Sequence, residues 1–190
     1  MANLPQRAPS GQGPMNIVKQ PNLYPRTCVT RIVNDLFVII NDGINPTLEA
    51  FIFTLSQLPG VGEFTKIFQS YCIEQIEFWI RPEYTQLVDS ATLSNAKNVE
   101  LYTAVDLTNN SAPPSVDSLL EYQSVAHTNI TTNHYRKFKP SYMLGGVAPS
   151  CNLISCDNPD ERWNCLKVAI PPCGVAMTFR TVVKYKVALS

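Results

Sequence analysis

The stretch FTLSQLPGVGEFTKIFQSYCIEQIEFWIRP, residues 53–82, decides the expected fold. It opens as a strand and turns at Leu58-Pro59-Gly60. Apolar residues then follow a helical spacing, at Val61, Phe64, Ile67, Phe68 and Tyr71. From Cys72 the period becomes two, and a second strand is expected to end at Arg81-Pro82, with Glu74 as an exception on its apolar face. Because so short a helix is unstable alone in water, we expect its apolar stripe to pack on a sheet.

Strand-like segments dominate the rest of the chain. They lie at residues 27–40, 48–55, 99–107, 123–131, 133–139, 163–170 and 177–189. A single helical turn is expected within 115–122, capped by Ser115. Strands without regularly interleaved helices argue against a parallel sheet. We therefore predict an all-β fold, an eight-stranded antiparallel jelly-roll sandwich with one short helix between the second and third strands.

Composition favours one large domain with an arm. The 190 residues are 45% hydrophobic and 16% charged, enough to bury a sizeable core while leaving much of the surface uncharged, as suits a surface covered by partners. Residues 1–26 are rich in proline, glycine, glutamine and asparagine and are expected to form a flexible N-terminal arm, followed by the jelly-roll domain at 27–190. The sequence contains neither an apolar run that would span a membrane nor a signal-peptide h-region, so we expect no membrane insertion.

Metal, cofactor and catalytic chemistry are not expected. The six cysteines, at 28, 72, 151, 156, 165 and 173, form no C-x-x-C pair, so we expect reduced and mostly buried thiols. His127 and His134 are the only histidines, and no nucleophile elbow or phosphate loop accompanies them. A cupin-like enzyme would need more histidine ligands, so we predict no enzyme. A soluble carbohydrate-binding jelly roll, with Trp79 or Trp163 stacking on a sugar, remains an alternative.

Charge is unevenly distributed along the chain. Residues 1–31 contain Arg7, Lys19, Arg26 and Arg31 and no acid, and residues 162–190 contain five bases and no acid. Residues 32–135 contain twelve acids and three bases. This asymmetry is either scatter or the mark of a face for nucleic acid. The segment HYRKFKP, residues 134–140, is the densest basic patch, and it is either a nucleic-acid contact or a strand edge protected by lysines.

Four segments in order resemble the capsid proteins of small circular Rep-encoding single-stranded DNA (CRESS-DNA) viruses, of the circovirus-like kind. They are residues 53–82, quoted above, VELYTAVDLTNNSAPPSVDSLLEYQSVAH at 99–127, TTNHYRKFKP at 131–140 and WNCLKVAIP at 163–171. The resemblance implies a virion shell protein that self-assembles, as a homo-oligomer of sixty copies with T=1 symmetry, around circular single-stranded DNA. It also implies that loops 83–97, 108–122 and 141–162 make the subunit contacts and meet a host-cell receptor or glycan.

The resemblance, taken with the basic patches, gives seven candidate nucleic-acid-binding residues: Arg7, Lys19, Arg26, Arg31, Arg136, Lys137 and Lys139. Members of this family commonly carry a long arginine-rich arm, which this chain lacks. Four bases per chain in sixty copies would neutralise about 240 phosphates, far fewer than a genome of roughly a thousand nucleotides carries. We therefore expect weak, salt-dependent binding. The C-terminal bases and HYRKFKP, polyamines or metal ions would supply the remaining charge, or the particle assembles empty.

Overall fold

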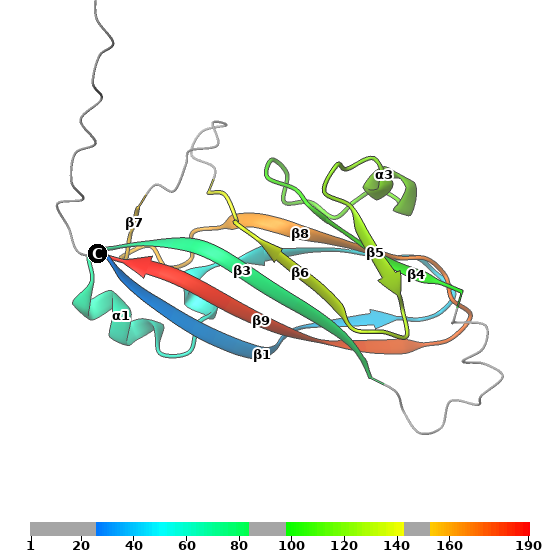
Figure 1. The fold of residues 1–190 in the computed structure, drawn as a ribbon, viewed down its shortest axis with the longest axis horizontal. Coiled ribbons are helices and arrows are strands. Elements are labelled where there is room, and N and C mark those ends of the chain that lie inside the picture. The colour runs from blue at the N-terminus through cyan, green and yellow to red at the C-terminus, as the bar shows by residue number, and fades with distance from the viewer. Residues whose placement is uncertain (1–25, 84–97, 143–152) are drawn as a thin grey trace, which may run out of the picture.

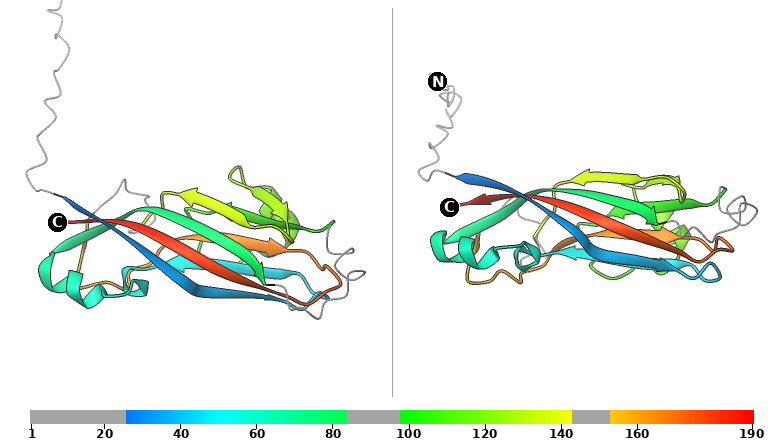
Figure 2. Two further views of the ribbon diagram at one scale, coloured as in Figure 1. Left: turned by 60° about the horizontal axis from the view of Figure 1, so that its bottom comes forward. Right: turned by 90° about the horizontal axis from the view of Figure 1, so that it is seen from below.

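Two antiparallel sheets face each other in the computed structural model, which describes residues 26–83, 98–142 and 153–190 (Figures 1 and 2). The first sheet has the order β1-β9-β3-β6, formed by Thr27–Asn41, Met177–Leu189, Ser70–Glu83 and His134–Phe138. The second has the order β2-β8-β4-β5, formed by Thr47–Phe53, Trp163–Ile170, Glu100–Val105 and Ala126–Asn129. Most consecutive strands lie in opposite sheets, and β4 and β5 are neighbours within the second sheet. This strand order is that of a jelly roll, and the predicted fold class is confirmed.

One strand was not expected from the sequence. β7, Ile154–Ser155, lies within the segment predicted to be a long loop, and it pairs with the start of β3. Two residues are too few to show an alternating pattern, so the sequence carried no signal for it.

The expected helix lies between the second and third strands. β2 is followed by a short 3₁₀ helix, Leu55–Gln57, and by α1, Val61–Ile67. Phe64 is buried beneath α1, but Ile67 is 73% exposed, so its expected place on the buried stripe was wrong. The reason is that α1 ends there: Phe68 is already extended, and its N–H bonds to the carbonyl of Phe64. Tyr71, also placed on that stripe, is buried as part of β3.

β3 departs from strict alternation at one point. A bulge between Ile73 and Gln75 shifts its register against β9, so Ile73 and Ile76 both face the core. The expected position of Glu74 on the apolar face was therefore wrong, since it pairs with Lys186. β3 also runs through Pro82 to Glu83, beyond its expected end. Pro82 lies past the last β6 pair at Ile80, where β9 is the only described neighbouring strand, and a proline is tolerated at such an edge.

Aromatic side chains fill the space between the sheets. Phe37, Phe51, Phe53 and Phe78 lie with ring centroids 4.6 to 6.1 Å apart. Every second residue of β9 joins this core, as its alternation predicted: Met177, Phe179, Thr181, Val183, Tyr185, Val187 and Leu189 are all buried.

The outer face of the second sheet is partly covered. α3, Val116–Leu120, places Leu119 against Ala104 and Ala169. Ser115 caps this helix by accepting a hydrogen bond from the Ser118 N–H, as expected. Among the described residues, no helix is long and apolar enough to cross a membrane.

Candidate assembly and nucleic-acid surfaces

β1 exposes a row of apolar side chains at the edge of the first sheet. Ile32, Val38 and Ile40 project from its outer face, and Ile44 follows in the turn to β2; their exposed fractions are 56%, 46%, 69% and 79%. We call these four residues the β1 ridge. A long edge strand with exposed apolar residues is a template for association with another chain.

A bulge in the middle of β1 shapes this ridge. The register against β9 shifts between Asn34 and Val38, and Asp35 has a φ of 52°. Thr181 of β9 fills the gap: its hydroxyl donates to the carbonyl of Phe37 at 2.7 Å and accepts from the Phe37 N–H at 3.0 Å. Phe37 is thereby turned into the core while Val38 remains outside.

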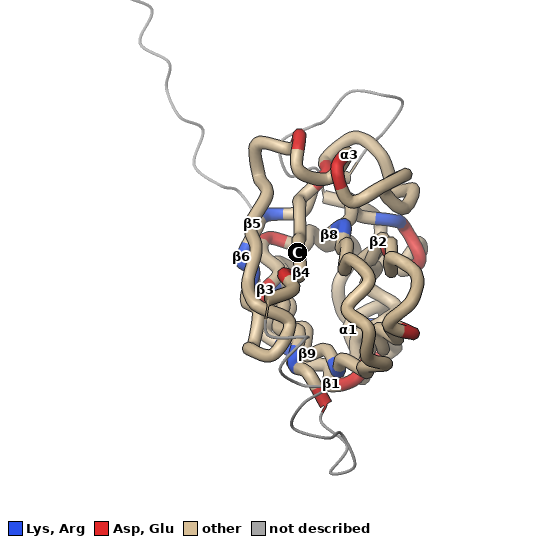
Figure 3. Tube along the Cα trace, turned by 90° about the vertical axis from the view of Figure 1, so that its right-hand side faces the viewer, with Lys and Arg blue, Asp and Glu red and all other residues tan. Residues whose placement is uncertain are grey.

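The bases of the C-terminal strand do not form a free cationic surface. Lys186 lies 2.9 Å from Glu74, Lys184 lies 3.3 Å from Glu77, and Arg180 lies 2.9 Å from Glu83. Arg180 also reaches Asp35 at 3.8 Å. Basic and acidic positions are accordingly interspersed in Figure 3. The outer face of the first sheet is close to neutral, which reduces its long-range attraction for phosphates.

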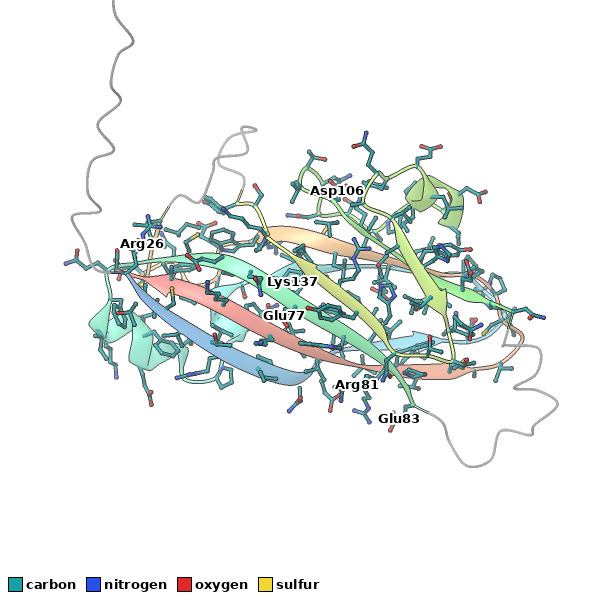
Figure 4. The ribbon with its side chains drawn as sticks, viewed as in Figure 1. Arg26, Glu77, Arg81, Glu83, Asp106 and Lys137 are labelled. Carbon is teal, nitrogen blue, oxygen red and sulfur yellow. The ribbon has the colours of Figure 1, made fainter. Side chains whose placement is uncertain are left out.

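The candidate nucleic-acid-binding residues are not brought together. Arg7 and Lys19 lie outside the described residues. Arg26 is exposed just before β1, at the end of the sandwich where the chain terminates (Figure 4). Arg31 is on β1, over the Phe64 ring at 5.1 Å, whereas Lys137 is on β6 at the opposite edge of the sheet.

The segment HYRKFKP is divided between two faces by strand alternation. Arg136 faces the same side as the buried His134 and donates to the carbonyl of Ser124 at 2.6 Å. Burial lowers the pKa of Arg136. Tyr135 and Lys137 face outward and are exposed, and Lys139 is exposed beyond the end of β6. The exposed bases of this segment are therefore Lys137 and Lys139, and Arg136 does not belong to that exposed set.

A buried ion pair lies on the outer face of the second sheet, and sequence reasoning missed it. Lys167 Nζ lies 2.7 Å from Asp106 Oδ2, and the two side chains are 2% and 4% exposed. The Tyr122 hydroxyl accepts from Lys167 at 2.9 Å and donates to Asp106 at 2.8 Å. The other Asp106 oxygen accepts from the Thr108 and Asn109 N–H groups.

This network holds the loop that carries α3. Burial alone would raise the pKa of Asp106 and lower that of Lys167, but their mutual contact and hydrogen bonds shift both the opposite way. Both groups are therefore charged at neutral pH. The sequence signal was a lysine within the apolar strand WNCLKVAI, which had been counted only as a C-terminal base.

The two histidines lie in different settings. His127 is exposed on β5 and lies 2.9 Å from Glu100. His134 is buried between the sheets, with Nε2 2.7 Å from the Thr103 hydroxyl and Nδ1 3.0 Å from the Thr128 hydroxyl. Burial lowers the pKa of His134 to about 4. Both ring nitrogens are thus occupied by a structural network.

Other predicted positions are also located. Cys28 is exposed, while Cys72, Cys156, Cys165 and Cys173 are buried, and Cys151 lies outside the described residues. Trp163 is 1% exposed, which removes it as a sugar-stacking residue. Most of the predicted contact loop 83–97 and part of 141–162 lie outside the described residues. Within the described ranges, no three potential metal ligands converge.

Comparisons with solved structures identify the architecture. The chain is similar to the BFDV capsid protein in a decameric crystal form, with a TM-score of 0.59 and 15% identity over 87% of this chain and 99% of the other. The chain is also similar to the 60-mer form of the BFDV capsid protein, with a TM-score of 0.55 and 13% identity over 87% of this chain and 93% of the other. A third similar structure is a semi-empty virus-like particle of the giant freshwater prawn Macrobrachium rosenbergii nodavirus. Its TM-score is 0.58, with 9% identity over 97% of this chain and 94% of the other.

Neither protein-family models nor curated proteins match the sequence. The structural likeness nevertheless extends over most of both chains in each comparison. At these identities it establishes a jelly-roll fold of the kind used by viral capsid proteins.

Proposed function

We propose that this chain is a viral capsid protein, a non-enzymatic shell subunit of the virion. Sixty copies would assemble into a T=1 particle around a circular single-stranded DNA, as in a circovirus-like CRESS-DNA virus. One observation carries this proposal. The chain combines a jelly-roll strand order with a helix between β2 and β3, and 87% of it is structurally similar to a capsid protein that forms a 60-mer.

The β1 ridge supports a function that depends on association between copies of this chain. Its side chains lie at a strand edge, where water is displaced only if another surface covers them. A symmetric shell repeats one such contact in every subunit, so a modest apolar area is multiplied over the particle. The buried Asp106–Lys167–Tyr122 network fixes the loop at 106–125 and would make this loop a rigid contact element.

Fewer bases are available for nucleic-acid binding than the sequence contains. Arg180, Lys184 and Lys186 are paired with acids, and Arg136 is turned inward. Arg7, Lys19, Arg26, Arg31, Lys137 and Lys139 remain the proposed contacts, together with Arg136 if its bond to Ser124 opens. Binding would be weak and would decline with salt.

Negative-stain electron microscopy of the purified chain tests the shell, and nuclease digestion of the same sample tests its content. We expect round particles of uniform diameter that protect a DNA from nuclease. Uniform particles without nucleic acid would support the shell function and refute the DNA-packaging role. A monodisperse monomer under all conditions of salt and concentration would refute both.

A further inference from the structure

Two aromatic rings lie side by side on the outer face of the first sheet, away from the core. Trp79 of β3 is directly opposite Tyr135 of β6 in the strand register. Their ring centroids are 5.1 Å apart with an interplanar angle of 37°. Tyr135 is 46% exposed and Trp79 partly exposed, so together they present two tilted aromatic faces to solvent.

One cation lies on each side of this pair along the strands. Lys137 follows Tyr135 by two residues on β6, and Arg81 follows Trp79 by two residues on β3, each about 7 Å along the same face. Because the strands are antiparallel, the two cations extend in opposite directions from the rings. Figure 4 shows Lys137 and Arg81 separated along the sheet.

These two cations differ from the other bases of the same face. Arg180, Lys184 and Lys186 are each held by a carboxylate. Within the described part of the chain, neither Arg81 nor Lys137 makes an ion pair or a side-chain hydrogen bond. They therefore remain available to an anionic ligand, and the aromatic surface between them is available for stacking.

We propose that Trp79 and Tyr135 form a stacking platform for an unpaired nucleobase, with Lys137 and Arg81 contacting the phosphates on either side. Base–aromatic stacking tolerates any base and does not require a strongly positive surface, which suits a face whose charges are mostly paired. Identifying the ligand as packaged single-stranded DNA rests on the proposed capsid function.

A second aromatic pair provides a matched control. Tyr102 and His127 are stacked on the outer face of the second sheet, with centroids 5.9 Å apart. Their neighbour is Glu100, which lies 2.9 Å from His127. The acid beside the Trp79–Tyr135 pair is Glu77, opposite Lys137, and it differs from Glu100 in being paired with Lys184 at 3.3 Å. The exposed His127 can be replaced without disturbing the core.

The test uses labelled oligothymidylate and an abasic oligonucleotide of equal length, which retains phosphates and lacks bases. We expect the purified protein to bind oligothymidylate about tenfold more tightly than the abasic strand, and Trp79→Ala and Tyr135→Ala to remove that preference. His127→Ala should retain it. Arg81→Ala and Lys137→Ala should weaken binding of both probes.

Intrinsic fluorescence adds a direct signal. The chain has two tryptophans, and Trp163 is buried, so quenching by oligothymidylate would report on Trp79. Equal binding of both probes, or unchanged quenching in Tyr135→Ala with unchanged affinity, would overturn the platform.

Particle formation is followed in parallel: if Trp79→Ala abolishes particles, this face is a subunit contact and the platform is refuted. If the wild-type chain forms no particles but still prefers oligothymidylate, the proposed shell function is refuted and the stacking platform is not.

Discussion

Lys167 and Asp106 form an ion pair 2.7 Å long that is almost completely removed from solvent, on the outer face of a sheet rather than between the two sheets. The loop after β4 closes over it, and Tyr122 bonds to both partners. Charge is tolerated here because Lys167 contacts both Asp106 and Tyr122, and both oxygens of Asp106 accept hydrogen bonds. An incomplete network would be destabilising, since burying an unpaired charge is costly.

Lys167→Met should therefore lower the free energy of unfolding by about 3–5 kcal/mol, because it leaves the Asp106 carboxylate buried without its cation. Urea unfolding followed by circular dichroism measures this loss. Lys184→Met is the matched control, since Lys184 is 35% exposed beside Glu77 and its loss should be much smaller. Equal losses in the two variants would contradict the account.

The sequence predicted the sheets better than the places where alternation fails. β9 alternates without interruption over thirteen residues, and each expected core residue is buried. Glu74 and Ile67 were misplaced because a bulge and a helix end are decided by tertiary contacts with β9 and by the turn into β3.

The candidate site shows the same limit. HYRKFKP was treated as one basic patch, but the two-residue period of β6 separates Arg136 from Lys137. Lys167 is one of the five C-terminal bases that the sequence analysis expects to contribute charge, although it lies in an apolar strand. A search for charges inside apolar strands would have found it, but its partner Asp106 is 61 positions away and was not identifiable by spacing.

Acid should destabilise the subunit through His134. Its pKa is about 4 in the fold against 6.5 for the ordinary group, so the unfolded chain binds the proton more readily. The contribution of neutral His134 is fully present above about pH 6.5 and is lost as the pH falls to about 4, a change of about 3 kcal/mol.

Urea titrations at a series of pH values measure this dependence. His134→Gln should have a shallower decline of stability between those limits than the wild type. An identical slope in His134→Gln and wild type would contradict the assignment of acid sensitivity to His134.

The β1 ridge should be required for association but not for folding. Ile40 is 69% exposed, so Ile40→Asp should leave the circular dichroism spectrum unchanged while placing an unpaired charge in the contact and preventing particle formation. Sedimentation velocity detects the loss. Ile67→Asp is the matched control at 73% exposure on α1, outside the ridge, and should assemble. Assembly of Ile40→Asp at wild-type yield would exclude the ridge as a contact.

Gly43 should not accept a side chain. It has a φ of 79°, and an added Cβ would lie 2.6 Å from the backbone of Val175 in the turn between β8 and β9. Gly174 has a similar φ of 72°, but its Cβ would enter open space. Both alanine variants carry the backbone cost of about 1 kcal/mol, and Gly43→Ala should lose clearly more stability because the turns must also separate. Equal thermal melting temperatures would contradict this packing.

Association of these jelly rolls into a closed shell is directly measurable. Analytical ultracentrifugation of the purified chain, which has a subunit mass of 21.2 kDa, measures the mass of the assembly. We predict a single large species near 1.3 MDa, about sixty copies. A species of one or two copies that persists at high protein concentration and across ionic strengths would exclude a closed shell.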